Sequence, residues 1–358
     1  MSDSEDTAKD KGVSPPPLPA DYGKPLTPVL ESERLLSLDV LRGFALLGIL
    51  VSNMFYFAQP LEQLGFRRGW WLGPGDLEAD WISIFLVEGK FYPLFCFLFG
   101  LGFSIQMDRA SSRGSDCKAK YRRRLFILMG LGLAHGIFLW DGDVLMAYAF
   151  CGFALLLFHN RKPLTLSIWA GALILLPAVL MLSLGLVIMV LSRNAELARM
   201  IQEVFAEDPQ SSLELSKAYM IGSYADAVFH RIRELIITIP VILFYAPSFL
   251  GLFLLGCLAG RKRITTEMAQ NHRFLIRILI LSASVGLVGN FFGTWVMMSA
   301  NMGEDLGLLF TGTAILSIFG PVLAVAYIAG IILLIAHKPS LSILHRSRRP
   351  DRWLLPTI

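Results

Sequence analysis

The stretch that decides the fold of this chain is RLFILMGLGLAHGIFLWDGDVLMAY, residues 124–148. It begins as a nonpolar run that only His135 interrupts, and it leads into the tight turn WDGD (140–143) before apolar sequence resumes. This pattern predicts a helical hairpin in a membrane, with His135 roughly one and a half helical turns before the tight turn and near one membrane face. Ionisable groups in lipid are energetically costly and usually mark function, so His135 and the two aspartates are the first candidate site residues.

Composition indicates a polytopic membrane protein. The chain of 358 residues is 54% hydrophobic and 17% charged, with a mean hydropathy of +0.58, whereas soluble domains carry about 25% charged residues. The net charge of +4 does not indicate nucleic-acid binding, because the basic residues cluster in short loops beside apolar segments. The cysteines are too few and too scattered for a disulfide framework or a zinc site: Cys96, Cys151 and Cys257 lie in apolar segments and Cys117 in a basic loop.

Eight segments are long and apolar enough to cross a bilayer, which takes about twenty residues per helix. We therefore predict an all-α transmembrane helix bundle, with spans near residues 37–58, 82–107, 123–140, 143–159, 164–192, 235–260, 274–299 and 307–336.

The spans divide the chain into five parts. A polar, Pro-rich tail that we expect to be disordered precedes a membrane half of five spans, an amphipathic segment outside the cytoplasm, a second membrane part of three spans and a polar end. Their boundaries are 1–33, 34–192, 193–234, 235–336 and 337–358.

The distribution of positive charge predicts the orientation of the bundle. Of the 32 Lys and Arg residues, 22 lie in segments that the eight spans place on one side, namely the start of the chain and residues 108–124, 160–163, 261–273 and 337–352. The alternate segments hold only 7. By the positive-inside rule both termini are cytoplasmic and the turn 140–143 faces outward.

Polar residues inside the spans give further candidates. Asp39 and Arg42 lie three apart at the start of the first span, where they can form an ion pair on one helical face. Asn53, near the outer end of the same span, either hydrogen-bonds to another helix or lines a site.

The second span begins irregularly. Gly89 and Pro93 interrupt it, so we expect residues 79–88 to lie along the outer surface before a shorter crossing begins near Phe91. That places Lys90 close to the outer interface, either as a substrate contact or as a snorkelling side chain paired with its neighbouring carboxylate.

His135 has two interpretations. A core histidine that bonds to a neighbouring helix needs no chemistry. A neutral imidazole flanked by a carboxylate can instead act as a general base, a nucleophile or a proton relay. The second interpretation is favoured because Asp141, Asp143, Tyr148, Asn53 and Lys90 all map to the same outer half of the bundle. No soluble-enzyme signature such as GxSxG, HExxH or a P-loop accompanies them.

Four stretches resemble a known family: RLLSLDVLRGFALLGILVSN (34–53), EGKFYPLFCFLFGLGFSI (88–105), RRRLFILMGLGLAHGIFLWDGDVLMAY (122–148) and FLGLFLLGCLAGR (249–261). The patterns LDxxRGxAxxGILxxN and HGxxxWDGDxL are similar to those of the YeiB-like bacterial inner-membrane proteins, whose C-terminal half is domain of unknown function 418. The resemblance covers about residues 34–336 and implies a multi-helix inner-membrane protein. It points to the motif positions Asp39, Arg42, Gly43, Asn53, Lys90, Arg124, His135, Trp140, Gly142, Asp143 and Tyr148.

The end of the chain departs from the family pattern. Members of the family continue after the eighth span with a stretch like GxMALTNYL and about two more spans, whereas this chain ends HRSRRPDRWLLPTI. A shifted reading frame converts codons for Met-Ala-Leu-Thr-Asn-Tyr into those for the last six residues. We therefore expect residues 337–358 to reflect a frameshift or a truncated gene model.

Three functions fit these observations. The first half of the family also resembles the transmembrane acetyltransferases of the heparan glucosaminide type. That resemblance implies acyl transfer from a cytoplasmic donor such as acetyl-CoA to an envelope sugar or lipid. His135 is then the general base or acyl carrier, Asp143 orients it, and Arg42 with basic residues such as Arg124 attracts the donor's phosphates.

The second function is transport of a small solute through a relay of His135, Asp143 and Lys90, although the two sets of four spans show no convincing internal repeat. The third is a non-catalytic scaffold.

Overall fold

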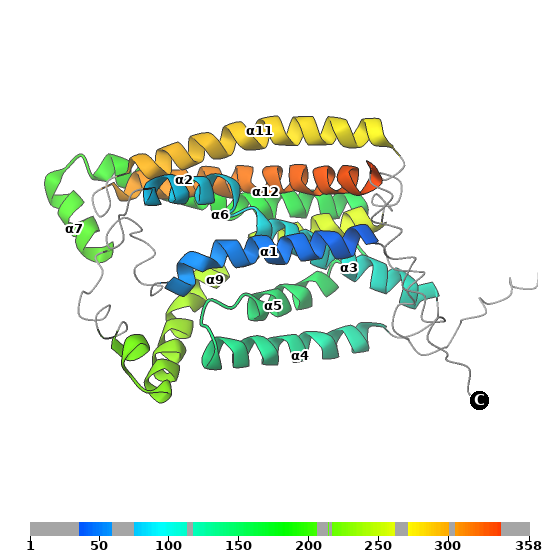
Figure 1. Cartoon of the computed structure of the whole chain (residues 1–358), viewed down its shortest axis with the longest axis horizontal. Helices are drawn as coiled ribbons and strands as arrows, with labels where there is room; N and C mark the ends of the chain where they lie inside the picture. Colours follow the sequence, from blue (N-terminus) through cyan, green and yellow to red (C-terminus); the bar gives the residue numbers. More distant parts are fainter. Residues whose placement is uncertain are drawn as a thin grey trace, which may run out of the picture.

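The computed structural model describes residues 36–58, 75–112, 117–205, 214, 217–261, 271–300 and 305–337. In these ranges the chain is helical and contains no strand. The helices are α1 (Leu36–Ala58), α2 (Asp76–Leu86), α3 (Phe91–Ser112), α4 (Cys117–Phe138), α5 (Leu145–Leu156), α6 (Pro163–Leu191), α7 (Ala195–Phe205), α9 (Tyr224–Arg261), α11 (His272–Ser299) and α12 (Leu306–His337). Figure 1 shows most of them lying side by side along one axis.

The helices confirm the predicted class of multi-pass membrane protein. Within the described residues, six segments are long and apolar enough to cross a bilayer, among them the continuous stretch from α2 through α3. The remaining two predicted spans correspond to α4 and α5. Helix α4 starts with a strongly basic segment, and α5 has only 12 residues, or about 18 Å against a hydrocarbon core of about 30 Å. The predicted span 143–159 is therefore shorter than expected.

The bundle has two distinct ends. Helices α1, α4, α6 and α11 start at one end, which we call the basic end, and the α4–α5 turn and α7 lie at the opposite end, which we call the turn end (Figure 1). The directions of these helices agree with the alternation that the charge distribution predicts. The basic end has its own fixed contact: Arg261, the last residue of α9, donates hydrogen bonds to the carbonyls of Phe158, His159 and Arg161.

Close helix contacts depend on small residues. Helices α11 and α12 form the most extensive pair, and a Cβ atom at Gly286 or Gly289 of α11 would meet Leu323 or Phe319 of α12. Without a hydrophobic driving force in lipid, such close packing is what holds helices together. Next to Gly289, the Asn290 side-chain amide donates to the Phe319 carbonyl at 2.9 Å, so a hydrogen bond reinforces the contact.

The second predicted span is a broken helix inside the bundle rather than a surface segment followed by a crossing. Helix α2 packs against α11, and α12 touches the α2–α3 break, because a Cβ at Gly320 would lie 2.5 Å from the Gly89 carbonyl. Gly320 lies near the middle of α12, so the break is near mid-depth. Gly89 has a φ of +74°, which turns the chain there. Lys90 is therefore at mid-depth and not near the outer interface as predicted.

The amphipathic segment 193–234 is divided differently from the prediction. Its first part forms α7, as the sequence indicates, but its second part is the beginning of the 38-residue helix α9, which bends along its course and contains Pro240 and Pro247 (Figure 1). The predicted tail 1–33 and nearly all of the predicted end 337–358 lie outside the described residues.

Candidate functional site

His135 and Asp143 face one another across the α4–α5 turn. The distance from His135 Nδ1 to Asp143 Oδ2 is 3.6 Å, and the Asp143 side chain is 5% exposed whereas that of His135 is 38% exposed. The other carboxylate oxygen of Asp143 accepts a hydrogen bond from the Leu145 backbone N–H at 2.7 Å. This bond holds the carboxylate in place, with its second oxygen toward the imidazole.

The close packing of the turn depends on Gly142. A Cβ atom at this position would lie 2.3 Å from the Trp140 ring, so any side chain here would have to displace the indole. The Trp140 ring in turn contacts Phe57 of α1 edge-to-face, with ring centroids 4.9 Å apart. This contact links α1 to the α4–α5 hairpin at the turn end.

The beginning of α9 braces the same turn, which the sequence did not indicate. Arg231 Nη1 and the Tyr224 hydroxyl both donate to the Phe138 carbonyl, at 3.1 and 2.7 Å, in the last turn of α4. Asp141 is buried, and burial raises the pKa of its carboxyl group, while a backbone hydrogen bond and the positive charge of Arg231 oppose the rise. Tyr224 and Arg231 at the beginning of α9 therefore hold the end of α4 beside the turn.

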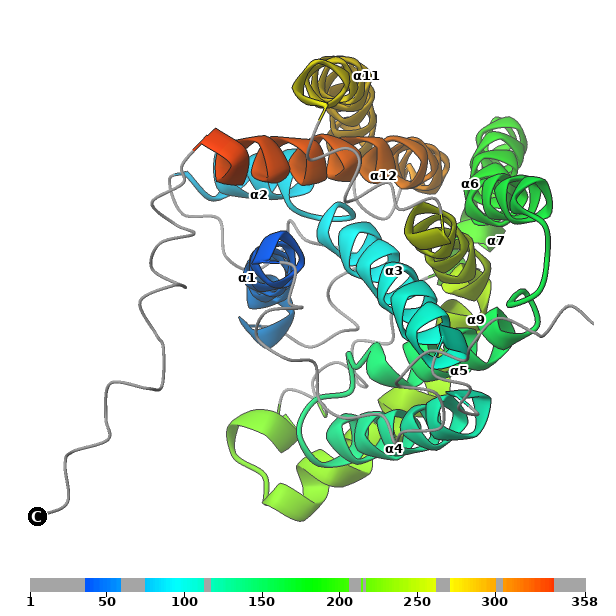
Figure 2. The ribbon, with the colours of Figure 1, turned by 90° about the vertical axis from the view of Figure 1, so that its right-hand side faces the viewer.

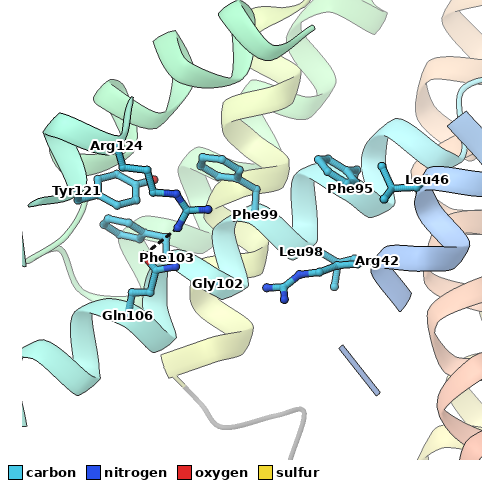
Figure 3. A pocket seen from close by; sticks show the side chains of 10 residues that line it. All are labelled: Arg42, Leu46, Phe95, Leu98, Phe99, Gly102, Phe103, Gln106, Tyr121 and Arg124. Carbon is cyan, nitrogen blue, oxygen red and sulfur yellow. Dashed lines mark hydrogen bonds between the residues drawn. The ribbon is translucent and has the colours of Figure 1, made fainter. Parts of the chain in front are cut away.

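A second polar site lies toward the basic end, where α1, α3 and α4 enclose a cavity of about 340 Å³. Two arginines predicted to attract a donor, Arg42 and Arg124, both line it. Figure 3 shows their side chains reaching into the space beside Gly102 of α3. Arg42 forms the predicted ion pair with Asp39 at 3.3 Å, and Arg124 Nη1 donates to Gln106 Oε1 at 3.2 Å.

The sequence motifs did not indicate the rest of the cavity lining. It is mostly apolar and aromatic: Leu46, Phe95, Leu98, Phe99, Phe103 and Tyr121. Gln106 was the one member with a sequence signal, because it is a polar residue inside a predicted span.

Helical periodicity relates the two polar sites. Arg124 and His135 are eleven residues apart on α4, so they lie on nearly the same face, about 16 Å apart along the axis. Arg42 and Asn53 have the same spacing on α1, and Asn53 precedes Phe57 by one turn. Because Arg42 and Arg124 line one cavity and Phe57 touches Trp140, these stripes of α1 and α4 face each other along the bundle.

Lys90 and Tyr148 lie apart from this arrangement. Lys90 is fully buried, and its Nζ atom donates to the Ile84 carbonyl at the end of α2. Tyr148 is 1% exposed within an aromatic cluster, where its ring stacks on Phe95 with centroids 5.8 Å apart. The Lys90 ammonium group thus caps the C-terminal end of α2. The Tyr148 ring packs behind Phe95, which lines the cavity.

The described residues contain no group of three or more His, Cys, Asp or Glu side chains placed to hold a metal ion. Cys96, Cys151 and Cys257 are free and buried in the helix core. The side chains at the two sites include an imidazole–carboxylate pair at the turn and two guanidinium groups at the cavity.

Comparisons with known proteins give relatives without an assigned activity. The family model described as "Protein of unknown function (DUF418)" matches residues 259–348. The chain is 33% identical to the uncharacterized protein YxaH of Bacillus subtilis over 279 residues, which cover 73% of this chain and 66% of that protein. It is 34% identical to an uncharacterized 39.9 kDa protein in the amylase 3′ region of Bacillus acidopullulyticus, over 42% of this chain and 41% of that protein.

A third relative is the uncharacterized protein YeiB of Escherichia coli, which is 35% identical over 34% of this chain and 30% of that protein. The matches thus span about two thirds of the first relative and less than half of the other two. No solved structure matches the chain.

Proposed function

This chain belongs to the YeiB-like membrane proteins that carry domain of unknown function 418, and from that premise we propose that it transfers an acyl group across a bacterial inner membrane. The donor is a cytoplasmic acyl thioester such as acetyl-CoA, and the acceptor is a hydroxyl group of an envelope sugar or lipid. The observation that carries the proposal is the alignment of the cavity with its two arginines and the His135–Asp143 pair on one face of α4.

The arginine cavity suits the phosphates of the donor. Arg42 and Arg124 come from different helices and line the same space. Guanidinium groups bind phosphate through several fixed donors. Five of the seven residues 118–124 are Lys or Arg, at the start of a helix where the backbone dipole also favours an anion. A donor held here needs an extended arm to bring its thioester about 16 Å along α4 to His135.

At the turn end, His135 and Asp143 supply acid–base chemistry. His135 Nε2 removes the proton of the acceptor hydroxyl, whose oxygen attacks the thioester carbonyl. The carbon–sulfur bond breaks, and the leaving thiolate takes the proton from the imidazolium, so an ester and a thiol are formed. The Asp143 carboxylate stabilises the imidazolium between these steps. In the carrier variant of this reaction, Nε2 itself first accepts the acyl group and then passes it to the hydroxyl.

Label transfer tests the proposal. Membranes that contain the protein are incubated with acetyl-CoA labelled in the acetyl group and with an envelope extract, and label in the sugar and lipid fractions is measured. We expect transfer that His135→Ala abolishes while the amount of inserted protein stays unchanged, and a labelled, hydroxylamine-sensitive protein only in the carrier variant. Undiminished transfer in His135→Ala membranes would eliminate the catalytic role.

The proposal also needs the basic end to face the cytoplasm. Reporter fusions after Asn160 and Asn194, at opposite ends of α6, test this orientation. We expect a cytoplasmic signal from the first and an external signal from the second. The reverse pattern would place the arginine cavity on the wrong side for a cytoplasmic donor.

Transport is the second candidate, and the α2–α3 break favours it. Discontinuous helices near the midplane form the substrate sites of many transporters, and here the break carries the fully buried Lys90. Proteoliposomes that enclose a pH-sensitive dye test this function through proton movement. Flux that Lys90→Met abolishes, without label transfer in the first assay, selects transport; transfer without flux selects acylation; and neither activity selects a scaffold.

A further inference from the structure

The cavity between α1, α3 and α4 changes character along its length. Gln106 and Phe95 of α3 are eleven residues apart and both line it, so it extends about 16 Å along the helix. Arg42, Arg124 and Gln106 lie toward the basic end, whereas Leu46 and Phe95 lie deeper in the bundle (Figure 3). The cavity is thus cationic at its mouth and apolar at its inner end.

The three helices that border the cavity leave both its cationic part and its apolar part accessible. Helix α1 packs on α3 and α12, whereas α4 packs on α5, α9 and α3, so α3 forms the floor and the other two helices form the walls. Figure 2, a view from the basic end of the bundle, shows α1 and α4 standing apart from one another along the same side of α3. Leu46 is 55% exposed although it lines the cavity, so its side chain has room beside it.

A short acyl group does not account for the apolar part. Binding a phosphate group needs only the two guanidinium groups. An acetyl group then has a single methyl group to place against the aromatic and leucine side chains of the apolar part. The four apolar residues of the inner end, Leu46, Phe95, Leu98 and Phe99, present a surface suited to a hydrocarbon chain. A volume of 340 Å³ is at the low end for ligand pockets, so it holds a head group and part of a chain rather than a whole donor.

We infer that this cavity binds an anionic amphiphile, with a phosphate at Arg42 and Arg124 and a hydrocarbon chain of several carbons along Leu46 and Phe95. Two sources share this chemistry: a medium- or long-chain acyl thioester that enters from the basic end, and an anionic phospholipid that enters from the bilayer. The assignment of the ligand as the acyl donor rests on the proposed function, whereas the binding chemistry does not.

Binding to the full-length protein in phosphatidylcholine nanodiscs tests the inference without any transfer reaction. Labelled CoA, acetyl-CoA and decanoyl-CoA are titrated, and phosphatidylglycerol is added as a competitor. We expect decanoyl-CoA to bind at least tenfold more tightly than acetyl-CoA. A tenfold difference corresponds to about 1.4 kcal/mol, the transfer energy of about two buried methylene groups.

Matched variants separate the two parts of the cavity. Leu46→Trp fills the apolar part, so it should remove the chain-length preference and leave CoA binding unchanged. Leu47→Trp, at an equally exposed neighbour outside the cavity, should change neither. Arg124→Gln should weaken CoA and decanoyl-CoA alike by about tenfold, whereas Arg123→Gln, the adjacent exposed arginine outside the cavity, should have less than a threefold effect.

The outcomes are distinct. Equal affinity for acetyl-CoA and decanoyl-CoA, or equal effects of Leu46→Trp and Leu47→Trp, overturns the inference. Phosphatidylglycerol that occupies the cavity while no CoA compound binds supports the amphiphile and identifies the lipid as its source, which removes the donor assignment. Chain-length-dependent binding together with an absence of label transfer supports the inference and contradicts the proposed reaction.

Discussion

Replacement of Asp143 by asparagine separates two roles that this carboxylate has in the turn. One oxygen accepts the Leu145 N–H at 2.7 Å, and the other lies 3.6 Å from His135 Nδ1. An asparagine side-chain carbonyl can keep the first bond. Its amide group, however, presents a donor or a neutral acceptor to His135 in place of a negative charge. Asp143→Ala loses both interactions and serves as the comparison.

The expected magnitudes follow from these contacts. At 3.6 Å the carboxylate oxygen and His135 Nδ1 are in ion-pair range but are not hydrogen-bonded at rest. A charged hydrogen bond that forms once the imidazole is protonated contributes about 1.5–3 kcal/mol, so loss of the carboxylate should slow a step that forms the imidazolium by roughly 10- to 150-fold. The stability of Asp143→Asn should change by less than about 1 kcal/mol, because the bond to Leu145 remains. Asp143→Ala should cost about 1–2 kcal/mol more, because the Leu145 N–H at the start of α5 loses its acceptor.

Two measurements on the same membranes decide the matter: the initial rate of label transfer per amount of protein, and the melting temperature of the solubilised protein. We expect Asp143→Asn to lower the rate at a nearly unchanged melting temperature, and Asp143→Ala to lower both. A rate within twofold of the wild type in Asp143→Asn refutes the role of the carboxylate. A rate that falls only in proportion to the melting temperature shows that the residue acts through folding alone.

Three further changes test the contacts around the two sites. Tyr327→Phe removes the hydrogen bond from the hydroxyl to the Leu86 carbonyl at the helix break and should lower the free energy of unfolding by about 1 kcal/mol. Tyr224→Phe removes an exposed hydrogen bond and should cost less, so equal melting temperatures of the two variants would argue against a buried break. Arg231→Ala removes a donor to the last turn of α4 and should speed the modification of His135 by diethylpyrocarbonate at unchanged protein amount, whereas an unaltered rate would show that the brace is not needed. Burial raises the pKa of Asp141, so folding favours the protonated carboxyl group, and its contribution to folding stability is lost as pH rises through the raised pKa. Asp141→Asn should therefore raise the melting temperature more at pH 8 than at pH 4. A gain in melting temperature that does not depend on pH would contradict this.

Local features of the fold followed from the sequence. Long apolar segments must become helices in lipid, because every backbone polar group has to be satisfied within the segment, and the part of the chain that the structure describes has six such helical segments. The ion pair of Asp39 and Arg42 was also predictable, since residues three apart on a helix always lie on one face. The meeting of His135 with Asp143 followed in the same way, because a short turn joins the helix ends that carry them.

Other features depended on the tertiary structure. Spans such as α6 and α12 are apolar on every side, so their sequences contain no periodic signal that tells which face is covered by protein and which by lipid. The bond of Tyr327 to Leu86 joins residues 241 positions apart. It exists only because α12 packs against the break between α2 and α3.

The functional sites show the same division. The sequence by itself determined a membrane bundle with His135 and Asp143 at one end, because composition, hydrophobic length and turn chemistry act over a few residues. Only the tertiary structure brought Arg42 and Arg124 together in one cavity and placed Lys90 in the core. The physical reason is that contacts between distant spans are set by the shapes of small and large side chains across helix faces, and that information is distributed over the whole bundle.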